Sequence, residues 1–293
     1  MITLGASPAS VPFGRFKNRV EVFDIIPGTR QLTIPEGWNK IRVAVVGGGG
    51  SGRNVTNKDQ HGFGGGGGGG GYAEIELDVV PGQSFTYTVG AGGDLNQDGG
   101  TTSFGALLSA TGGKAATDNT SVASKGGAGG TGIGGAINKA GGAGGNAFDA
   151  ASGGGGGGGA SGHRYGVGGA GGNGLDNANI PNAGGVGGSW VDGLRPLLYD
   201  DGWGLGITPH DLPLDAELTL QAIGGSNYLS VYSRVGQGTN HAAHQANIGG
   251  GSCSNRGGTA AVQRGGIGAG GGGGYNTYTG RGGPGAVIVE VLS

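Results

Sequence analysis

The chain has 293 residues, and 81 of them are glycine, a share about four times that of an average protein. Charged residues make up only 12% and the formal net charge is −2, so disorder driven by charge repulsion is not expected. An ordinary helical enzyme is excluded, because each glycine inside a helix costs about 1 kcal/mol relative to alanine. Collagen is excluded too, because no repeat with glycine at every third position runs through the chain.

Several kinds of site and segment are missing from the sequence. Cys253 is the single cysteine, which excludes an intrachain disulfide and a cysteine zinc site. Residues 1–16 lack a basic start followed by an apolar stretch, so we expect no signal peptide. We expect no membrane insertion, because no apolar run reaches about 18 residues. We also expect no nucleic-acid binding, because lysine and arginine do not cluster.

Strands are predicted before the first glycine run. Residues 20–25 and 31–34 alternate between apolar and polar side chains around the turn Pro27-Gly28, which predicts two strands. Residues 40–46 are β-branched and become fully apolar, which is typical of a buried strand.

Further strands follow the long glycine run. Residues 72–80 and 84–89 read as strands on either side of Pro81-Gly82-Gln83, and this spacing predicts a β-hairpin. Residues 286–291 are β-branched and predict a closing strand.

Glycine occurs both in uninterrupted runs, such as 64–71 and 153–159, and in Gly-Gly-X repeats. A polyproline-II-type helix has three residues per turn, so a Gly-Gly-X helix carries side chains on one edge alone. Neighbouring helices then approach until backbone N–H meets backbone C=O, and buried groups of this kind must be paired. We therefore expect a sandwich of polyglycine-II helices in which the X residues point outward or between layers. These X residues include Ala128, Ala143, Ala170 and Val186.

The expected fold is mostly β and irregular, with strands flanking the sandwich of packed polyglycine-II helices and almost no α-helix. Residues 190–235 interrupt the glycine pattern with tryptophans, tyrosines and leucines, which predicts a small insert with its own core. The predicted organisation is an N-terminal attachment segment (1–19), strands plus glycine-rich domain (20–188), an aromatic-rich insert (189–246), and the completion of the glycine-rich domain with its closing strand (247–293).

Binding residues are expected in the polar loops that connect glycine helices, because loops on a rigid scaffold carry function. These loops are rich in Asn, Thr, Ser, His and Tyr, as adaptable binding surfaces are. The candidate residues are His163, Arg164, Tyr165, Asp176, Asn177, Asn179, Tyr275, Asn276 and Tyr278.

Two phosphate-binding motifs are considered and rejected. Residues 45–52 satisfy the G-x-G-x-x-G dinucleotide pattern after a strand, but that motif needs a following helix and residues 53–71 are rich in glycine. A phosphate loop needs Lys and Ser or Thr after its last glycine, where this chain has Arg53 and Asn54.

For several further residues, a role as ordinary surface or core is favoured over a role in metal binding or catalysis. His241 and His244 have a spacing that metal ligands use, but exposed loop histidines are the favoured interpretation. The insert is acidic, and a solvated face is favoured over a calcium site or over a sugar-cleaving carboxylate pair at Asp200 and Asp201. For the aromatic residues of the insert, a role in its core is favoured over a role in stacking on sugars. Cys253 is expected to be unreactive. No catalytic residue, metal or cofactor is predicted.

An ordered set of motifs resembles the glycine-rich domain of bacteriophage tail-fibre and adhesin-tip proteins. The set begins with the strand 41–46 entering Gly47–Gly50, continues through 70–74, 81–83, 88–93, 99–105 and 110–113, and closes with 283–290. The resemblance implies a stack of polyglycine helices whose variable loops bind a receptor on the host surface. The insert departs from the pattern.

The resemblance leads to a functional expectation. The chain is expected to be a non-enzymatic virion protein of the tail fibre or tail tip, made in the host cytoplasm. Its expected partners are a bacterial polysaccharide or outer-membrane protein and, through the N-terminus, other tail proteins. A homotrimer and a single copy at the tip both fit the sequence. The alternatives are a purely structural tail component, whose loops face neighbouring subunits, and a glycine-helix ice-binding protein, which would need a flat, regular face of small residues.

Overall fold

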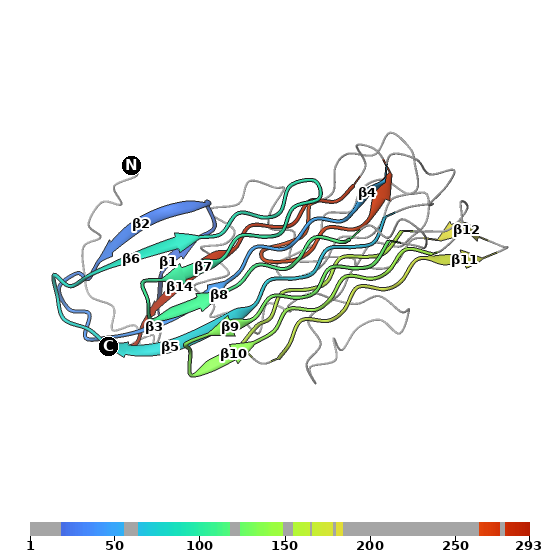
Figure 1. Cartoon of the computed structure of the whole chain (residues 1–293). Coiled ribbons are helices and arrows are strands. Elements are labelled where there is room, and N and C mark those ends of the chain that lie inside the picture. Colours follow the sequence, from blue (N-terminus) through green and yellow to red (C-terminus); the bar gives the residue numbers. More distant parts are fainter. Residues whose placement is uncertain are drawn as a thin grey trace, which may run out of the picture.

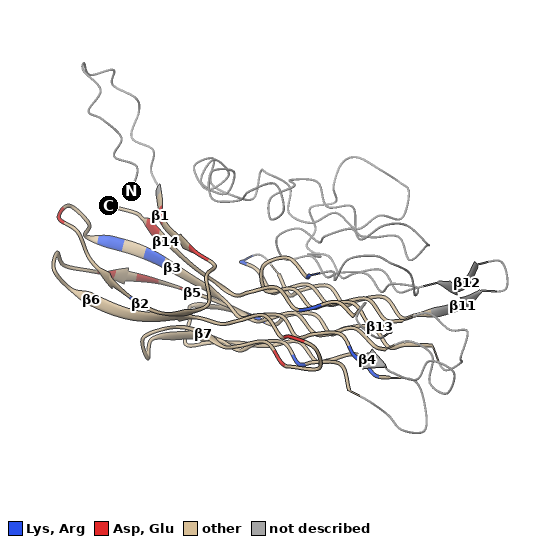
Figure 2. Ribbon diagram, turned by 90° about the horizontal axis from the view of Figure 1, so that it is seen from above, with Lys and Arg blue, Asp and Glu red and all other residues tan. Residues whose placement is uncertain are grey.

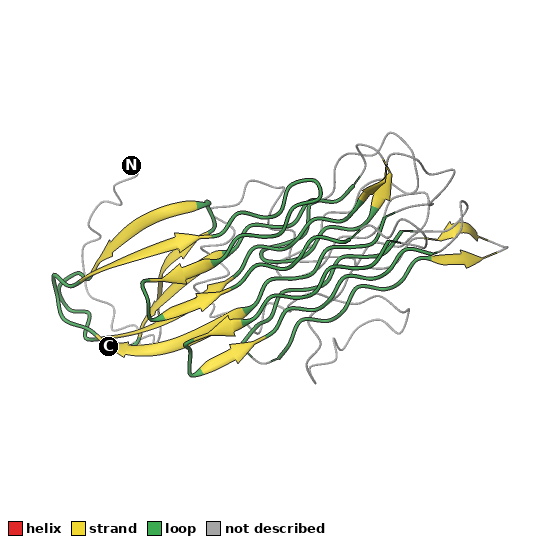
Figure 3. Ribbon diagram, viewed as in Figure 1, coloured by secondary structure: helices red, strands yellow, loops and turns green. Residues whose placement is uncertain are grey.

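The structure is a computed structural model that describes residues 19–55, 64–117, 124–148, 155–164, 166–177, 180–183, 264–275 and 279–293. Within these residues it contains strands and no helix. Two antiparallel sheets lie at one end of the molecule, and extended glycine-rich segments run side by side from them to the other end (Figure 1, Figure 3). The expectation of a mostly β and irregular fold is confirmed.

The first sheet, here sheet A, has the strand order β1-β14-β3-β5-β10. Its strands are β1 (Arg19–Asp24), β14 (Ala286–Val291), β3 (Lys40–Val46), β5 (Tyr72–Asp78) and β10 (Ile137–Lys139). The closing strand β14 lies between β1 and β3 and pairs antiparallel with both. The first and the last described strands, β1 and β14, are therefore paired in one sheet, although they are far apart in sequence.

The second sheet, here sheet B, has the order β2-β6-β7-β8-β9. Its strands are β2 (Gly28–Thr33), β6 (Ser84–Val89), β7 (Thr102–Phe104), β8 (Leu108–Ala110) and β9 (Gly132–Ile133). Two short pairs lie apart from both sheets: β4 (Asn54–Val55) with β13 (Gly274–Tyr275), and β11 (Leu175–Asn177) with β12 (Ile180–Ala183).

The predicted strands are confirmed, but the predicted hairpin between residues 72–80 and 84–89 is wrong. The turn exists, and Gly82 adopts the positive φ of 82° that it requires. However, β5 pairs with β3 and β10 whereas β6 pairs with β2 and β7. Each strand carries one apolar face, and placing the strands in opposite sheets buries both faces in one core.

That core lies between the two sheets. Ile41, Val43 and Val45 of β3 and Val287 and Val289 of β14 are almost wholly buried from the sheet A side. Sheet B contributes the buried side chains Tyr87, Val89, Phe104 and Leu108. The alternation of these residues along their strands fixes which face of each sheet points inward.

The glycine segments are joined laterally by backbone hydrogen bonds. Segment 64–71 has neighbours on every side, and it exchanges N–H···O=C bonds with segments 47–53, 111–114, 124–131, 140–147, 155–162 and 268–274. The donor–acceptor distances in this set are those of ordinary backbone bonds, for example 2.9 Å from Gly50 N to Gly68 O. Main-chain bonding between segments therefore replaces the side-chain core that glycine cannot supply.

The direction of these bonds repeats every three residues. Every third residue of segment 47–53 donates to the same neighbour: Gly47, Gly50 and Arg53 to segment 64–71, Gly48 and Ser51 to segment 97–100, and Gly49 and Gly52 to segment 280–283. A polyproline-II-type helix, with three residues per turn, produces this period. The full polyglycine-II sandwich stays a prediction that the period supports.

The same geometry explains why some segments are pure glycine and others follow Gly-Gly-X. Gly47–Gly50 and Gly64–Gly71 are buried throughout, because a neighbouring backbone faces each of their three edges. A Cβ on Gly67 would lie 2.2 Å from the carbonyl oxygen of Gly50, which leaves no room for a side chain. Segments in the outer layer have one free edge, and there the X residues Ala128, Ala143 and Ala170 are exposed, as predicted.

Some predicted elements lie outside the described residues. These are Val186, the insert 189–246 and all of the N-terminal segment 1–19 except Arg19, whose backbone begins β1.

Candidate functional site

The molecule has two distinct ends. At the end that we call the sheet end, Arg19 pairs with Val291, and the backbone N–H of Asn39 donates to the carbonyl of Ser293. We call the opposite end the loop end. There, described segments that lead away from the sheets end, and described segments that lead back begin. The flanking residues there are Val55 and Gly64, Thr117 and Ser124, Phe148 and Gly155, Asn177 and Ile180, and Tyr275 and Thr279.

Hydrogen bonds place these flanking residues together at the loop end. Gly64 N donates to Gly274 O at 3.2 Å, and Gly156 N donates to Gly64 O at 3.0 Å. Ala147 N donates to Ser124 O at 2.9 Å, and the Ser124 hydroxyl accepts a bond from Gly65 N. Described residues that are far apart in sequence therefore lie together at the end of the glycine segments opposite the two sheets (Figure 1).

The structure brings two of the predicted groups of site residues to this loop end. Asp176 and Asn177 lie in β11, where Asn177 pairs with Ile180 of β12. Tyr275 lies in β13, where it pairs in parallel with Val55 of β4. The backbone of these residues is described. The predicted site residues Asn179, Asn276 and Tyr278 lie outside the described residues, as does Tyr165.

His163 and Arg164 lie away from the loop end. Gly162 N donates to Gly70 O at 2.9 Å, so this part of the chain meets the seam between the glycine segments and β5. His163 is only 7% exposed. The Arg164 guanidinium donates to Glu74 of β5 at 2.8 Å. The structure therefore does not bring these two predicted residues together with the loop-end group, and their role in binding stays a prediction.

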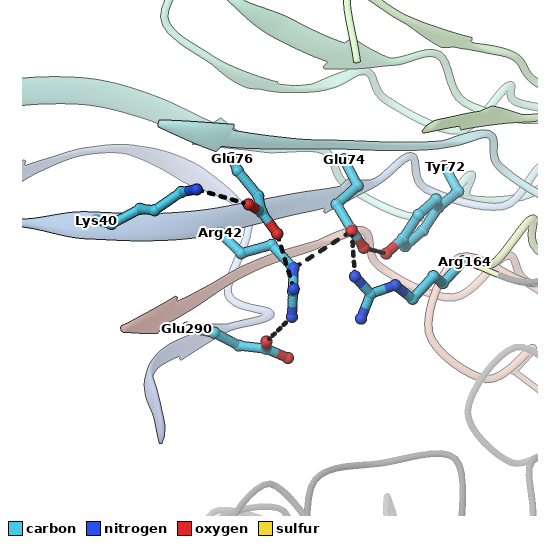
Figure 4. A network of polar contacts seen from close by, with 7 residues as sticks. All are labelled: Lys40, Arg42, Tyr72, Glu74, Glu76, Arg164 and Glu290. Carbon is cyan, nitrogen blue, oxygen red and sulfur yellow. Dashed lines mark hydrogen bonds and ion pairs between the residues drawn. The ribbon is translucent and has the colours of Figure 1, made fainter. Parts of the chain in front are cut away.

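Arg164 is part of a charged network on the outer face of sheet A (Figure 4). Arg42 of β3 lies at its centre, because the strand register places Glu290 of β14 and Glu76 of β5 on either side of it. Its guanidinium nitrogens lie 2.7 Å from Glu290 and 2.8 Å from Glu76. Burial by itself lowers the pKa of Arg42, but the hydrogen bonds to Glu76 and Glu290 outweigh it and raise that pKa.

Glu74 is the most buried carboxylate of the network, at 5% exposure. It accepts hydrogen bonds from Arg164 and from the Tyr72 hydroxyl, the latter at 2.5 Å, and its carboxylate lies 3.5 Å from Arg42 Nε. Burial, followed by the charge of Glu74, raises the pKa of Tyr72 well above its usual range, so the phenol stays protonated and donates a hydrogen bond to Glu74. Each of these charges faces an opposite charge, which ties Arg164 to the sheet.

Figure 2 shows how unevenly charge is distributed over the described residues. Lysine, arginine and acidic residues gather on β3, β5 and β14, while much of the length of the glycine segments is uncharged. Across the described part of the chain, no group of three or more His, Cys, Asp or Glu side chains is placed to hold a metal ion. His241, His244, Asp200, Asp201 and Cys253 lie outside the described residues.

The glycine motif after β3 is used for packing. In the dinucleotide fold, N–H groups of such a motif bind the pyrophosphate at the start of a helix. Here the N–H groups of Gly47–Gly50 donate to backbone carbonyls of other segments, and an extended segment follows instead of a helix. The N–H groups of this motif are therefore engaged in the packing of the glycine segments.

The sequence matches a family described as a glycine-rich domain over residues 25–292. The chain belongs to this family. The match begins directly after β1 and runs through β14, so the glycine-rich domain includes every described strand except β1 as well as the glycine segments. No curated protein matches the chain. None of the described residues forms a helix that could cross a membrane.

The charged network is the feature of the glycine-rich domain that sequence reasoning missed. Its signal was present, because Lys40 and Arg42 in one predicted strand and Glu74 and Glu76 in another have the period of two that puts them on one strand face. The register that sets Arg42 opposite Glu76 and Glu290 came from the paired strands.

Proposed function

We propose that the chain is a non-catalytic protein of a phage tail fibre or tail tip that binds a bacterial surface receptor through its loop end. The observation that carries this proposal is that the residues flanking several polar connecting sequences meet at the loop end, opposite the sheet end where Arg19 and Ser293 lie. In this proposal the sheet end attaches the molecule to the tail and the connecting sequences at the loop end bind the receptor.

The chemistry of the loop-end connections supports receptor binding. The connecting sequences 56–63, 118–123 and 276–278 are rich in Asn, Asp, Thr and Ser and nearly free of large apolar side chains. Adaptable hydrogen-bonding residues on a rigid scaffold are typical of recognition surfaces. A polysaccharide or an outer-membrane protein of the host is the receptor class that we propose, with no cofactor involved.

The sheet end supports an attachment role. The N-terminal segment 1–19 joins the described chain at Arg19, whose backbone begins β1 at this end. We propose that this segment binds other tail proteins, which places the chain in the virion.

The proposal is tested by binding of fluorescently labelled protein to susceptible host cells. We expect saturable binding that weakens at least about tenfold, or about 1.4 kcal/mol, when Tyr275, Asn276 and Tyr278 are changed to alanine. Replacing Asp176, Asn177 and Asn179 tests the neighbouring loop, and replacing His163, Arg164 and Tyr165 tests the seam. The matched control is Thr86→Ala, on the outer face of sheet B.

The structural alternative gives the opposite result. A protein that enters virions yet binds no susceptible strain would contradict the receptor-binding proposal. Loop-end variants that stop virion assembly, with the fold intact, would assign the loops to neighbouring subunits.

A specific observation keeps the ice-binding alternative in view. In the outer layer, Ala128, Ala143 and Ala170 are exposed on neighbouring segments, although Lys125, Asn146 and Asn173 are exposed on the same segments. The same purified protein should be assayed for thermal hysteresis, and its absence excludes this alternative.

A further inference from the structure

Glycine segments do not by themselves fix their position along one another. The backbone groups that join them are alike at every glycine, and the direction of the bonds repeats every three residues. A segment that slides by three residues, about 9 Å, therefore meets an equivalent set of partners. In a β-strand a slip is opposed because it carries side chains to the wrong face, but a run of glycine has no side chains to misplace.

Segments 155–162 and 166–174 are joined by a tight reversal beside sheet A. His163 and Gly166 exchange backbone hydrogen bonds of 3.1 and 3.2 Å across it. In the described part of the chain, neither segment continues into a strand of the two sheets at this end, whereas their neighbour 64–71 continues into β5. Strand register therefore positions that neighbour but does not position these two segments.

The sequence of segment 155–162 permits a slip toward the sheets. Its bonds to segment 64–71 come from three glycines at the period of the helix, namely Gly156, Gly159 and Gly162. A slip of three residues toward the sheets would fill places 156–162 with the glycine run 153–159. Every place would then hold a glycine, and the bonds to segment 64–71 would form again.

A slip in the opposite direction, toward the loop end, is blocked by a side chain. It would carry Ser161 into the place of Gly158, where a Cβ would lie 2.1 Å from the carbonyl oxygen of Gly270. The slip toward the sheets meets no such obstacle in segment 155–162, because its incoming residues are all glycine. The register of this segment therefore needs a constraint that acts against one direction.

The asparagine of segment 166–174 does not supply that constraint. Asn173 Oδ1 accepts a hydrogen bond from Asn146 N at 2.8 Å. Ala143 lies three residues before Asn146, so its N–H has the same direction and offers Asn173 an equivalent bond after the slip. The side-chain bond is thus regained, and it does not distinguish the two registers.

Arg164, in the reversal, forms a contact that does not repeat along the stack (Figure 4). Its guanidinium lies 2.8 Å from Glu74 of β5. Side chains on one face of a strand follow one another at about 7 Å, so a slip of about 9 Å does not match the spacing from Glu74 to Glu76. Glu76 already bonds to Arg42 and Lys40. The ion pair of Arg164 is therefore lost when the segments slip.

The network on sheet A is balanced in charge only when Arg164 is part of it. Three carboxylates then face three cations, namely Glu74, Glu76 and Glu290 with Lys40, Arg42 and Arg164. Without Arg164, Glu74 retains Arg42 Nε at 3.5 Å, while the other nitrogens of Arg42 bond to other carboxylates. Glu74 is almost wholly buried, and a buried charge that loses its partner is costly. Setting register is the best-attested role of such buried contacts.

We propose that the Arg164–Glu74 ion pair fixes the register of segments 155–162 and 166–174 along the glycine stack. Arg164 is then a positioning residue, which sets how far along the stack this part of the chain reaches. Segment 166–174 leads directly into β11, so a slip of one turn would move β11 by about 9 Å relative to the rest of the loop end. The proposal concerns register alone, and it stands whether or not the chain binds a receptor.

Disulfide trapping in the full chain measures this register. Gly171 N donates to Ala143 O, so cysteines at Ala143 and Ala170 report the observed register. Cysteines at Ala143 and Asn173 report the slip toward the sheets, and cysteines at Ala143 and Val167 report the blocked direction. A disulfide needs Cα atoms within about 7 Å, so a difference of one turn separates the three pairs.

Variants of the ion pair are compared in a Cys253→Ser background. With Arg164 and Glu74 unchanged, we expect the Ala143–Ala170 pair to close and the Ala143–Asn173 pair to stay open. In Arg164→Gln, closure of the Ala143–Asn173 pair should rise at least about tenfold, because losing one partner of a partly buried ion pair shifts an equilibrium by that factor or more. Glu74→Gln, which keeps the shape of the side chain and removes its charge, should give the same rise.

Two further variants separate register from general loosening. Arg164→Lys keeps the positive charge and should retain the pattern of the unmodified chain. Lys114→Gln is the matched control, because it breaks an ion pair with Asp98 between two other glycine segments, where both side chains are exposed. We expect it to leave all three cysteine pairs unchanged.

The proposal is overturned if folded Arg164→Gln and Glu74→Gln chains close the Ala143–Ala170 pair alone. An equal rise of the Ala143–Val167 pair would also overturn it, because slip in both directions indicates a loosened stack. So would closure of the Ala143–Asn173 pair in the Lys114→Gln control.

Discussion

At the scale of single residues, strand register turns isolated charges into a network. Arg42 bonds to carboxylates on both neighbouring strands because Glu290 and Glu76 occupy the paired positions. Glu74, one pair of positions further along β5, joins Tyr72 and Arg164 to the same face. Buried charges are costly unless they are paired and hydrogen-bonded, so the network fixes the register of these strands as well as the position of Arg164.

Replacing Glu76 by glutamine should lower stability in a pH-dependent way. Hydrogen bonds from Arg42 and then Lys40 lower the pKa of Glu76 in the folded state, so ionised Glu76 stabilises the fold above the ordinary value of 4.5, and this stabilisation is lost as the pH falls through the folded pKa. We expect Glu76→Gln to cost at most about 1 kcal/mol at pH 7, because the side chain is partly exposed. The difference from the unmodified chain should shrink at about pH 3.

Denaturant unfolding at the two pH values measures this effect. Glu36→Gln, in an exposed turn, is the control. An equal loss at both pH values would show that Glu76 stabilises the fold by means other than its charge.

At the scale of the element, the unit of this protein is a glycine segment whose neighbours are set by a period of three. Where backbone surrounds a segment, as at 64–71, every position must be glycine. Where one edge is free, the third position takes a side chain, as Ala128 does in segment 124–131. The sequence pattern of a segment therefore reports its place in the stack.

Moving one methyl group by one position tests that statement without changing composition. In Gly127→Ala/Ala128→Gly the new Cβ would lie 2.0 Å from the carbonyl oxygen of Lys114. We expect the exchange to destabilise the protein by about 1–3 kcal/mol, as overpacking of a rigid interior does. The control Ala128→Gly alone should cost about 0.4–1 kcal/mol, through the entropy of the unfolded chain. Equal unfolding temperatures for the two variants would contradict the period of three.

At the scale of the whole molecule, the sheets and the glycine segments are stabilised in different ways. The sheets bury an ordinary apolar core and bring the described start of the chain together with its end. The glycine segments carry no comparable core, and they extend the structure away from the sheets by lateral backbone bonding. The result is a molecule with two distinct ends, the sheet end and the loop end.

Fusions at the two ends should have opposite effects on the proposed function. A folded reporter domain fused after Ser293, at the sheet end, should leave saturable binding to host cells intact. The same domain inserted within 118–123, between Thr117 and Ser124 at the loop end, should abolish it by covering the surface. Binding that survives the insertion and is lost with the fusion would place the receptor surface at the sheets.

Much of the fold could be predicted from the sequence. Residues 40–46, 72–80, 84–89 and 286–291 have local patterns strong enough to give their strands. The short strands β7 to β10 were missed, because each has three residues or fewer and too little pattern to stand out between glycines. The prediction of a hairpin was wrong for another reason. A turn sequence indicates that the chain reverses, but it does not indicate which sheet each strand joins.

The candidate site was predictable only in part. Loop composition pointed to Asp176 and Tyr275, which the structure places at the loop end. It also pointed to Arg164, and nothing local in the sequence revealed that Glu74, far away in the chain, would bind that side chain.

The sequence by itself determined that glycine must pack by backbone hydrogen bonding, because 81 residues without side chains have no other means of cohesion, and that X residues of the repeat face outward or lie between layers. Only the tertiary structure decided which segments are neighbours, which strands share a sheet and which charges meet. The physical reason is that a backbone hydrogen bond is the same for every glycine, so the choice of neighbour is left to the chain's connections and to the packing of the two sheets from which the segments extend.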